Sequence, residues 1–307
     1  MLIAKVAIGF SRSATLIFSL TCLLACEVEK SSDYRLHFSP SSPVTKTDYI
    51  FGIHPLHNPQ RLFEIFNPYM QYLSDNIEGV SFSLEASRNY EAFDEKLYSG
   101  KLDFALPNPF QTFNAMSKGY RVFAKMGDDE NFKGIILTRR DGGIEKVTDL
   151  KGKAVSYPAP TALAATMMPQ YYLQTHGVDV TEDLDNRYVG SQESSIMNVY
   201  LKQTSAASTW PLPWIALSKE RPELADELEV KWSTPPLINN GLVAKHDIPN
   251  SIVEQVANLT AELHLHPEGV LMLEAMALSQ FELATNEDYL VVDQFLIKFN
   301  EQVRPIN

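Results

Sequence analysis

Eight side chains that can hydrogen-bond or stack follow the predicted strands of this chain. They are His54, Tyr90, Asn108, Tyr157, Thr161, Gln192, Glu193 and Trp210. Side chains just beyond the carboxyl ends of strands gather at one edge of an open α/β sheet. Aromatic rings beside a few hydrogen-bonding groups suit a pocket for a small molecule. We therefore predict that these residues bind a small ligand.

One stretch, residues 149–177, combines several signals for such a pocket. It reads as a turn, a buried strand over 154–157, a proline-containing loop and a helix over 161–176, with no charged residue between Ala154 and His176. A helix that begins beyond a strand offers free N–H groups and a positive dipole end, which hold small anions. The wall of a pocket and a plain buried crossover both fit this pattern.

Several candidates also have a structural explanation. Thr161 suits the N-cap of the helix over 161–176. Trp210 begins an aromatic–proline cluster that either closes over a ligand or packs between lobes, and Gln192 with Glu193 also suits a solvated loop. The pair Asn239–Asn240 lies at a predicted crossing between lobes, where a hinge role competes with ligand contact.

Strands and helices alternate from residue 48 onward. We expect strands over 49–53, 80–85, 102–106, 134–137, 154–157, 187–189, 206–209, 229–232 and 240–244. We expect helices over 61–76, 89–99, 110–118, 161–176, 194–203, 249–265 and 268–278. This alternation predicts an α/β fold with mainly parallel sheets flanked by helices.

Composition and charge narrow the class of protein. The chain has 307 residues, of which 45% are hydrophobic, so a packed core is expected rather than disorder. The formal net charge is -12, which argues against nucleic acid as a partner because phosphate contacts need clustered Lys and Arg.

The N-terminus predicts export. Lys5 and Arg12 precede a short apolar run over 13–25, which ends at Cys26 and is shorter than a membrane-spanning helix. The pattern resembles a bacterial lipoprotein signal over 1–26, with Cys26 as the lipidated residue; an ordinary cleaved signal or an uncleaved anchor are the alternatives. Residues 27–47 read as a flexible tether. The only other cysteine is Cys22, so we expect no disulfide in the mature protein.

Taken together, the motifs of the body resemble the type 2 periplasmic binding proteins of ABC transporters, and in particular the phosphate/phosphite/phosphonate-binding family. The resemblance covers residues 49–245. It rests on the order and spacing of the segments 51–53, 68–73, 89–93, 100–105, 108–110 and 149–153 and of the helix through Pro169.

The resemblance implies two α/β lobes with a ligand cleft between them. Lobe 1 would comprise residues 48–137 and 241–307, and lobe 2 residues 138–240. It further implies a monomer in the periplasm, lipid-anchored to the membrane, that binds a small solute without a cofactor and delivers it to a permease and ATPase complex.

The ligand residues of the family are matched only in part. Tyr90 matches an aromatic position that lines the family cleft. Counting back from Pro169, Ala162-Leu163-Ala164-Ala165 stands where the family has Ser-Thr-Ser-Gly, and the acidic position that can meet a ligand amine aligns near Ala206. Missing hydroxyl donors weaken the case for a doubly charged phosphonate. A neutral or less charged ligand is therefore also expected.

Two other functions compete with transport. A sensory lipoprotein would present the same ligand to a membrane receptor, and a hydrolase would turn it over. No G-x-S-x-G, G-x-G-x-x-G, P-loop or H-E-x-x-H motif occurs, so we expect no catalysis. The pairs His54/His57 and His264/His266 lack metal-site spacing, so we expect no metal.

Overall fold

The computed structural model describes residues 46–306. The predicted signal segment over 1–26, its lipidation at Cys26 and nearly all of the tether over 27–47 lie outside these residues and stay predictions. Strand β1 begins at Thr47, the last residue assigned to the tether. Within 46–306, no helix combines the length and apolar character needed to span a membrane.

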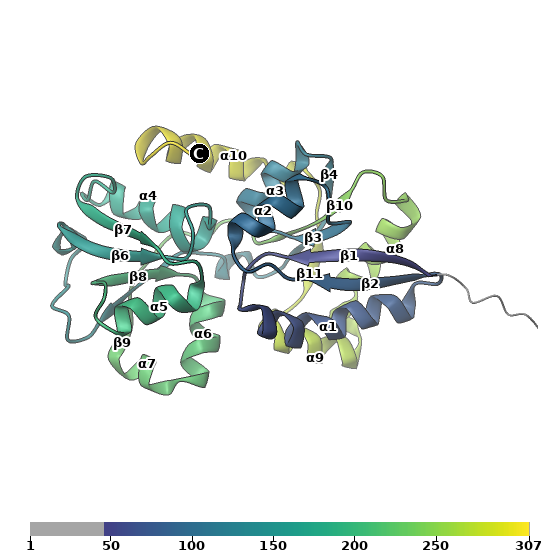
Figure 1. Ribbon diagram of the computed structural model, residues 1–307, viewed down its shortest axis with the longest axis horizontal. Coiled ribbons are helices and arrows are strands. Elements are labelled where there is room, and N and C mark those ends of the chain that lie inside the picture. Colours follow the sequence, from purple (N-terminus) through teal and green to yellow (C-terminus); the bar gives the residue numbers. More distant parts are fainter. Residues whose placement is uncertain (1–45, 307) are drawn as a thin grey trace, which may run out of the picture. The chain divides into compact units, whose positions relative to one another are not determined.

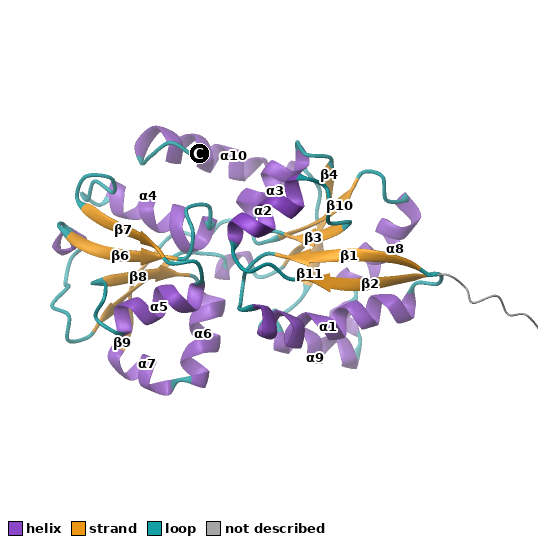
Figure 2. Ribbon diagram, in the orientation of Figure 1, coloured by secondary structure: helices purple, strands orange, loops and turns teal. Residues whose placement is uncertain are grey.

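The first sheet has six strands in the order β11-β4-β10-β3-β1-β2. These are β1 (Thr47–Ile53), β2 (Val80–Glu85), β3 (Phe104–Leu106), β4 (Tyr120–Met126), β10 (Gly241–Lys245) and β11 (Phe281–Leu283). Strand β1 pairs in parallel with β2 and β3, whereas β10 and β11 pair antiparallel with their neighbours (Figure 2).

The second sheet has five strands in the order β7-β6-β8-β5-β9. These are β5 (Ile135–Arg139), β6 (Lys153–Tyr157), β7 (Leu184–Tyr188), β8 (Ala206–Thr209) and β9 (Leu228–Ser233). Strand β6 pairs in parallel with β7 and β8, and β5 pairs antiparallel with β8 and β9. Both sheets are therefore mixed, with a parallel part at one side.

Helices flank both sheets (Figure 1). They are α1 (Pro59–Asn76), α2 (Tyr90–Tyr98), α3 (Pro109–Met116), α4 (Met168–Thr175), α5 (Gln192–Tyr200), α6 (Pro211–Glu220), α7 (Pro222–Glu227), α8 (Asn250–Ala261), α9 (Pro267–Ala275) and α10 (Leu290–Gln302). Proline opens α1, α3, α6, α7 and α9, because its fixed φ suits the first helical position and its missing N–H costs no bond there.

The helix predicted over 161–176 begins later and less regularly. It opens with a π-helical turn, Leu163–Met167, and continues as α4. The N–H of Met167 bonds to the carbonyl of Ala162 at 3.2 Å, five residues back. Ala162 holds the N-cap position without a side-chain bond, so the interpretation of Thr161 as the N-cap is wrong.

Two segments cross between the sheets, residues 127–134 and 234–240. They lie side by side, because the Leu237 N–H donates to the Phe132 carbonyl at 2.9 Å and the Gly134 N–H donates to Thr234 Oγ1 at 3.0 Å. Asn239 is fully buried, and its Nδ2 donates to the Gly127 carbonyl at 2.7 Å.

The C-terminal helix α10 packs against both α3 and α4 (Figure 1). Phe295 of α10 meets Tyr171 of α4 edge-on, with ring centroids 5.7 Å apart. Beyond α10, Arg304 Nε donates to Gln170 Oε1 at 3.0 Å and Arg304 Nη2 donates to the Pro160 carbonyl at 2.8 Å. The chain end thus holds the start of α4 and the loop before it.

Candidate functional site

A small buried cavity lies where the two sheets point their strand ends at each other. It is lined by His54, Tyr90, Asn108, Phe132, Ala162, Leu163, Ala164, Ala165, Gln192, Trp210 and Asn240. His54 follows β1, Tyr90 opens α2 after β2, and Asn108 follows β3. Gln192 opens α5 after β7, and Trp210 follows β8. The carboxyl ends of strands from both sheets therefore supply most of the wall, as expected for an α/β site.

Helix starts hold the polar side chains of the first sheet in place. Asn108 is the N-cap of α3, where its side chain accepts the Gln111 N–H at 3.0 Å while the Gln111 side chain accepts the Asn108 N–H. The Asn108 Nδ2 atom donates to the Thr161 carbonyl at 3.3 Å, and this bond links α3 to the loop after β6.

A chain of hydrogen bonds joins the two sheets across the cavity. Thr209 Oγ1 donates to Gln192 Oε1 at 2.7 Å, and Gln192 Nε2 donates to the Tyr90 hydroxyl at 3.2 Å. Because the Tyr90 oxygen accepts this bond, its own hydrogen remains to donate to a ligand.

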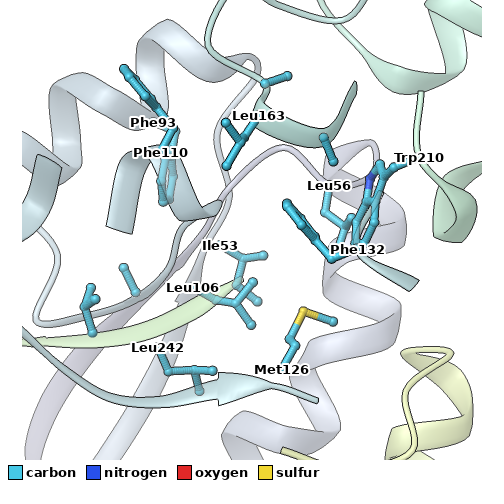
Figure 3. Packing of buried hydrophobic residues seen from close by; sticks show 14 of the residues in the cluster. Ile53, Leu56, Phe93, Leu106, Phe110, Met126, Phe132, Leu163, Trp210 and Leu242 are labelled. Carbon is cyan, nitrogen blue, oxygen red and sulfur yellow. The ribbon is translucent and has the colours of Figure 1, made fainter. Parts of the chain in front are cut away.

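The opposite wall is apolar. The rings of Phe132 and Trp210 lie 5.5 Å apart at a 60° angle (Figure 3), and Leu163 lines the same cavity. Trp210 is 3% exposed, so this wall is closed to solvent. An apolar wall opposite polar groups is the usual lining of a pocket for an organic solute.

The first turn of the helix after β6 adds backbone donors. Ala162 to Ala165 line the cavity. The Ala162 N–H donates to the Ala159 carbonyl at 3.2 Å, so the N–H groups without a partner inside the helix are those of residues 163–165. Alanine at these positions contributes no hydroxyl, so only the backbone N–H groups can donate to a ligand from this turn.

The lining carries no formal charge. It contains no Asp, Glu, Lys or Arg. Burial lowers the pKa of His54 to about 4, against an opposing contribution from its bond to the Leu106 carbonyl, so this ring is neutral at pH 7. Burial likewise raises the pKa of Tyr90, which stays a neutral phenol. The cavity can bind by hydrogen bonds and the helix dipole but has no cation to pair with an anion.

The structure brings together five of the eight predicted residues: His54, Tyr90, Asn108, Gln192 and Trp210. Thr161 instead lines a neighbouring crevice with Asn89, Glu91 and Asp94.

Tyr157 and Glu193 also lie apart from the cavity lining. Tyr157 is fully buried at the end of β6 beside Tyr188, with ring centroids 5.9 Å apart. Glu193 is half-buried and accepts a hydrogen bond from Asn58 Nδ2 at 3.0 Å. Ligand binding stays a prediction for all eight residues.

Phe132 is not among the residues predicted from the sequence, and Asn240 was undecided between a hinge role and ligand contact. Both belong to the crossing segments rather than to strand ends. The Asn240 side chain is fully buried, with Nδ2 3.3 Å from Met126 Sδ. The paired asparagines at 239–240 were the one available signal for this part of the lining.

The cavity has a volume of only about 10 Å³, enough for roughly one water molecule. Its walls come from both sheets and are bonded to each other across the cavity. A solute larger than water therefore requires the walls to separate. Within residues 46–306, no three or more His, Cys, Asp or Glu residues are grouped to hold a metal ion.

The family of ABC transporter, phosphonate, periplasmic substrate-binding proteins matches this chain over residues 51–289. The chain belongs to this family. The resemblance inferred from the order and spacing of the sequence motifs is thereby confirmed. This family member is 19% identical over 295 residues to the phosphonates-binding periplasmic protein of Escherichia coli (strain K12). The match covers 94% of this chain and 83% of that protein.

Solved structures confirm the two-lobed periplasmic-binding-protein fold of this family member. A binding-protein component of an ABC phosphonate transporter from Pseudomonas aeruginosa superposes with a TM-score of 0.77 at 18% identity, covering 84% of this chain and 88% of that one. A Prochlorococcus marinus (MIT 9301) protein in complex with methylphosphonate gives a TM-score of 0.76 at 19% identity, covering 83% and 99%.

Proposed function

We propose that this protein captures a small solute outside the cytoplasm and delivers it to the permease and ATPase complex of an ABC uptake system. The observation that carries this proposal is the buried cluster of uncharged polar groups at the strand ends of both sheets. Membership of the family supports the role of substrate-binding protein.

Opening and closing of two lobes would admit and enclose the solute. We assign residues 48–137 and 241–307 to lobe 1 and 138–240 to lobe 2, and the paired segments 127–134 and 234–240 to the hinge. The Gln192–Tyr90 and Asn108–Thr161 hydrogen bonds would break on opening, because each joins the two lobes. Closed lobes would then be recognised by the permease.

The ligand we propose is a small phosphonate-type oxyacid or a less charged solute of similar size. Relatives whose names specify phosphonate or phosphite support the first class. The alanines at 162, 164 and 165 and the uncharged lining favour a ligand with low charge, because a buried charge needs paired or strongly hydrogen-bonded partners.

The location we propose is the periplasm, with the protein held to the membrane by a lipid on Cys26. The signal pattern over 1–26 supports this anchor. Mass spectrometry of the mature N-terminus tests it: a diacylglyceryl group on Cys26 is expected, and an unmodified N-terminus elsewhere would contradict the anchor.

A thermal-shift panel on the purified protein tests the binding role. The panel contains methylphosphonate, phosphite, phosphate, methanesulfonate, amino acids and pyrimidines. A ligand at 100 times its Kd adds about 2.7 kcal/mol to the apparent free energy of unfolding. Failure of every compound to shift the melting temperature would count against a solute-binding role, and product formation would instead support a hydrolase.

Two variants locate the site. Tyr90→Ala removes a lining ring and the bond to Gln192, and should abolish the ligand-induced shift. Thr161→Ala tests the neighbouring crevice: a shift that is kept assigns the ligand to the cavity, and a shift that is lost extends the site to the crevice. Deletion of the gene should abolish solute uptake; normal uptake with lost signalling would instead favour the sensory role.

A further inference from the structure

Two residues of the cavity lining, Asn240 and His54, carry hydrogen-bond acceptors. Asn240 Oδ1 is buried and has no partner among residues 46–306. The Asn240 Nδ2 atom points at the thioether of Met126, which can only accept, and this contact fixes the orientation of the amide. A buried acceptor without a donor costs free energy that a ligand donor would recover.

The second acceptor is His54. Its Nδ1 lies 2.9 Å from the Leu106 carbonyl, which has no hydrogen to give, so Nδ1 must carry the proton. The neutral ring then has a lone pair on Nε2, which can accept a hydrogen bond from a ligand. His54 is 2% exposed and lines the cavity, so its acceptor is part of the site.

Donors surround these two acceptors. The Tyr90 hydroxyl hydrogen, the amides of Asn108 and Gln192 and the first N–H groups of the helix after β6 all suit the oxygens of a ligand. A ligand that accepts from these donors and gives a hydrogen to one of the two acceptors has several acceptor oxygens and at least one acidic hydrogen. A fully deprotonated dianion fails this requirement, because it would meet two lone pairs with oxygen lone pairs.

We propose that the cavity selects the singly protonated monoanion of a phosphonate-type oxyacid over its dianion, with the P–OH hydrogen donated to His54 Nε2 or Asn240 Oδ1. This inference rests on the proposed solute-binding function and specifies the form of the ligand. The single charge also suits a lining without Lys or Arg.

Other titratable groups near His54 must be separated from titration of the ligand. His57, next to His54 and Arg61, has its pKa lowered to about 3 by burial first and by these two neighbours. Asp94 near Tyr90 has its pKa raised to about 6 by burial. Measurements between pH 7 and 9 keep both histidines neutral and Asp94 ionised.

Calorimetric titration of the purified protein with methylphosphonate and with methanesulfonate tests the proposal. The two compounds share size and shape, but the sulfonate is a monoanion without a hydrogen to donate. If only the protonated phosphonate binds, its apparent Kd rises about tenfold per pH unit above its second pKa. We expect methanesulfonate to bind at least about tenfold more weakly than the phosphonate monoanion, with no dependence on pH. Phosphite and phosphate, which also carry P–OH groups, identify which oxyacid is preferred.

Variants connect the effect to the two acceptors. His54→Asn keeps a donor toward Leu106 but removes the Nε2 lone pair, and Asn240→Leu removes Oδ1 at similar volume. At least one of them should reduce the preference for methylphosphonate over methanesulfonate about tenfold or more. His176→Asn, an exposed histidine stacked on Tyr172, is the matched control and should change neither affinity.

Each outcome decides the question. Equal binding of phosphonate and sulfonate, or phosphonate affinity that is constant or rises above the second pKa, overturns the inference and leaves the binding function intact. Saturable binding of only an amine or a neutral solute likewise overturns the inference and leaves the binding function intact. Failure of all compounds to bind overturns both. The comparison of the two ligands needs no variant, so it remains decisive even if a variant does not fold.

Discussion

Replacement of Arg304 should weaken the contact between the chain end and the second sheet. Arg304 donates to Gln170 Oε1 at 3.0 Å and to the Pro160 carbonyl at 2.8 Å, and its guanidinium lies 5.1 Å from the Phe299 ring centroid. Gln170 is fully buried, so its oxygen has no solvent to replace the lost donor. The Pro160 carbonyl belongs to an exposed residue and can bind water instead.

The bond to Gln170 therefore dominates the expected loss. A hydrogen bond to a charged group contributes about 1.5–3 kcal/mol, and the contact with Phe299 adds roughly 0.5–1 kcal/mol. We expect Arg304→Ala to lower the free energy of unfolding by about 2–3 kcal/mol, after allowance for the partial exposure of Arg304. Arg304→Lys, which cannot donate to both acceptors in the same geometry, should fall in between.

Urea unfolding followed by circular dichroism measures these values. Arg140→Ala is the matched control, because Arg140 is exposed and donates to Glu229 at 3.4 Å and to the Ala225 carbonyl at 3.3 Å. An exposed pair contributes less than about 1 kcal/mol. If Arg304→Ala costs no more than Arg140→Ala, the chain end does not hold the second sheet and the reasoning is refuted.

Three further predictions concern the cavity and its neighbourhood. Gly134→Ala would place a Cβ 2.6 Å from the Ala164 carbonyl oxygen, so it should cost roughly 1–3 kcal/mol in urea unfolding and weaken ligand binding; unchanged binding would show that the turn at Ala164 is not part of the site. Gln192→Leu and Tyr90→Phe should each lower stability and show a coupling energy of at least about 0.5 kcal/mol in a double-mutant cycle, whereas additive losses would mean that their bond contributes nothing. Stability should fall as pH drops from 6.5 toward 4, by up to about 3 kcal/mol, because His54 has a folded pKa of about 4 and the unfolded chain takes up the proton first; a pH profile of unfolding for His54→Asn that matches the unmodified protein would contradict this.

Alternation of apolar runs and helical stripes predicted most of the elements that position the site. The strands over 80–85 and 206–209 have the predicted bounds, because their apolar patterns are local. Strand β4 was missed, since it carries Arg121 and Lys125 within its seven residues. Lys125 is accommodated by Asp129 at 3.0 Å and Glu282 at 2.6 Å, and these partners are not evident from the local sequence.

Site residues that come directly after a strand were predicted from the sequence. The prediction failed where it depends on the direction in which a side chain points. Gln192 and Glu193 are neighbours on α5, and consecutive residues of a helix face different ways, so only Gln192 meets the cavity. Phe132 lies on a crossing segment, and its place against Trp210 depends on how the two sheets are joined. Spacing along the chain carries no information about that arrangement.

The π-helical turn at Leu163–Met167 has a consequence for how this chain is aligned with its relatives. A π turn closes a bond over five residues instead of four, so it contains one residue more than an α turn. Where a relative has an α turn at this place, this chain contains one extra residue. If the two chains are aligned after the turn, their positions before the turn are shifted by one. Simple counting back from Pro169 pairs the hydroxyl positions of the family with residues 162–165. Allowance for the extra residue moves the start of this match one place earlier, to Thr161.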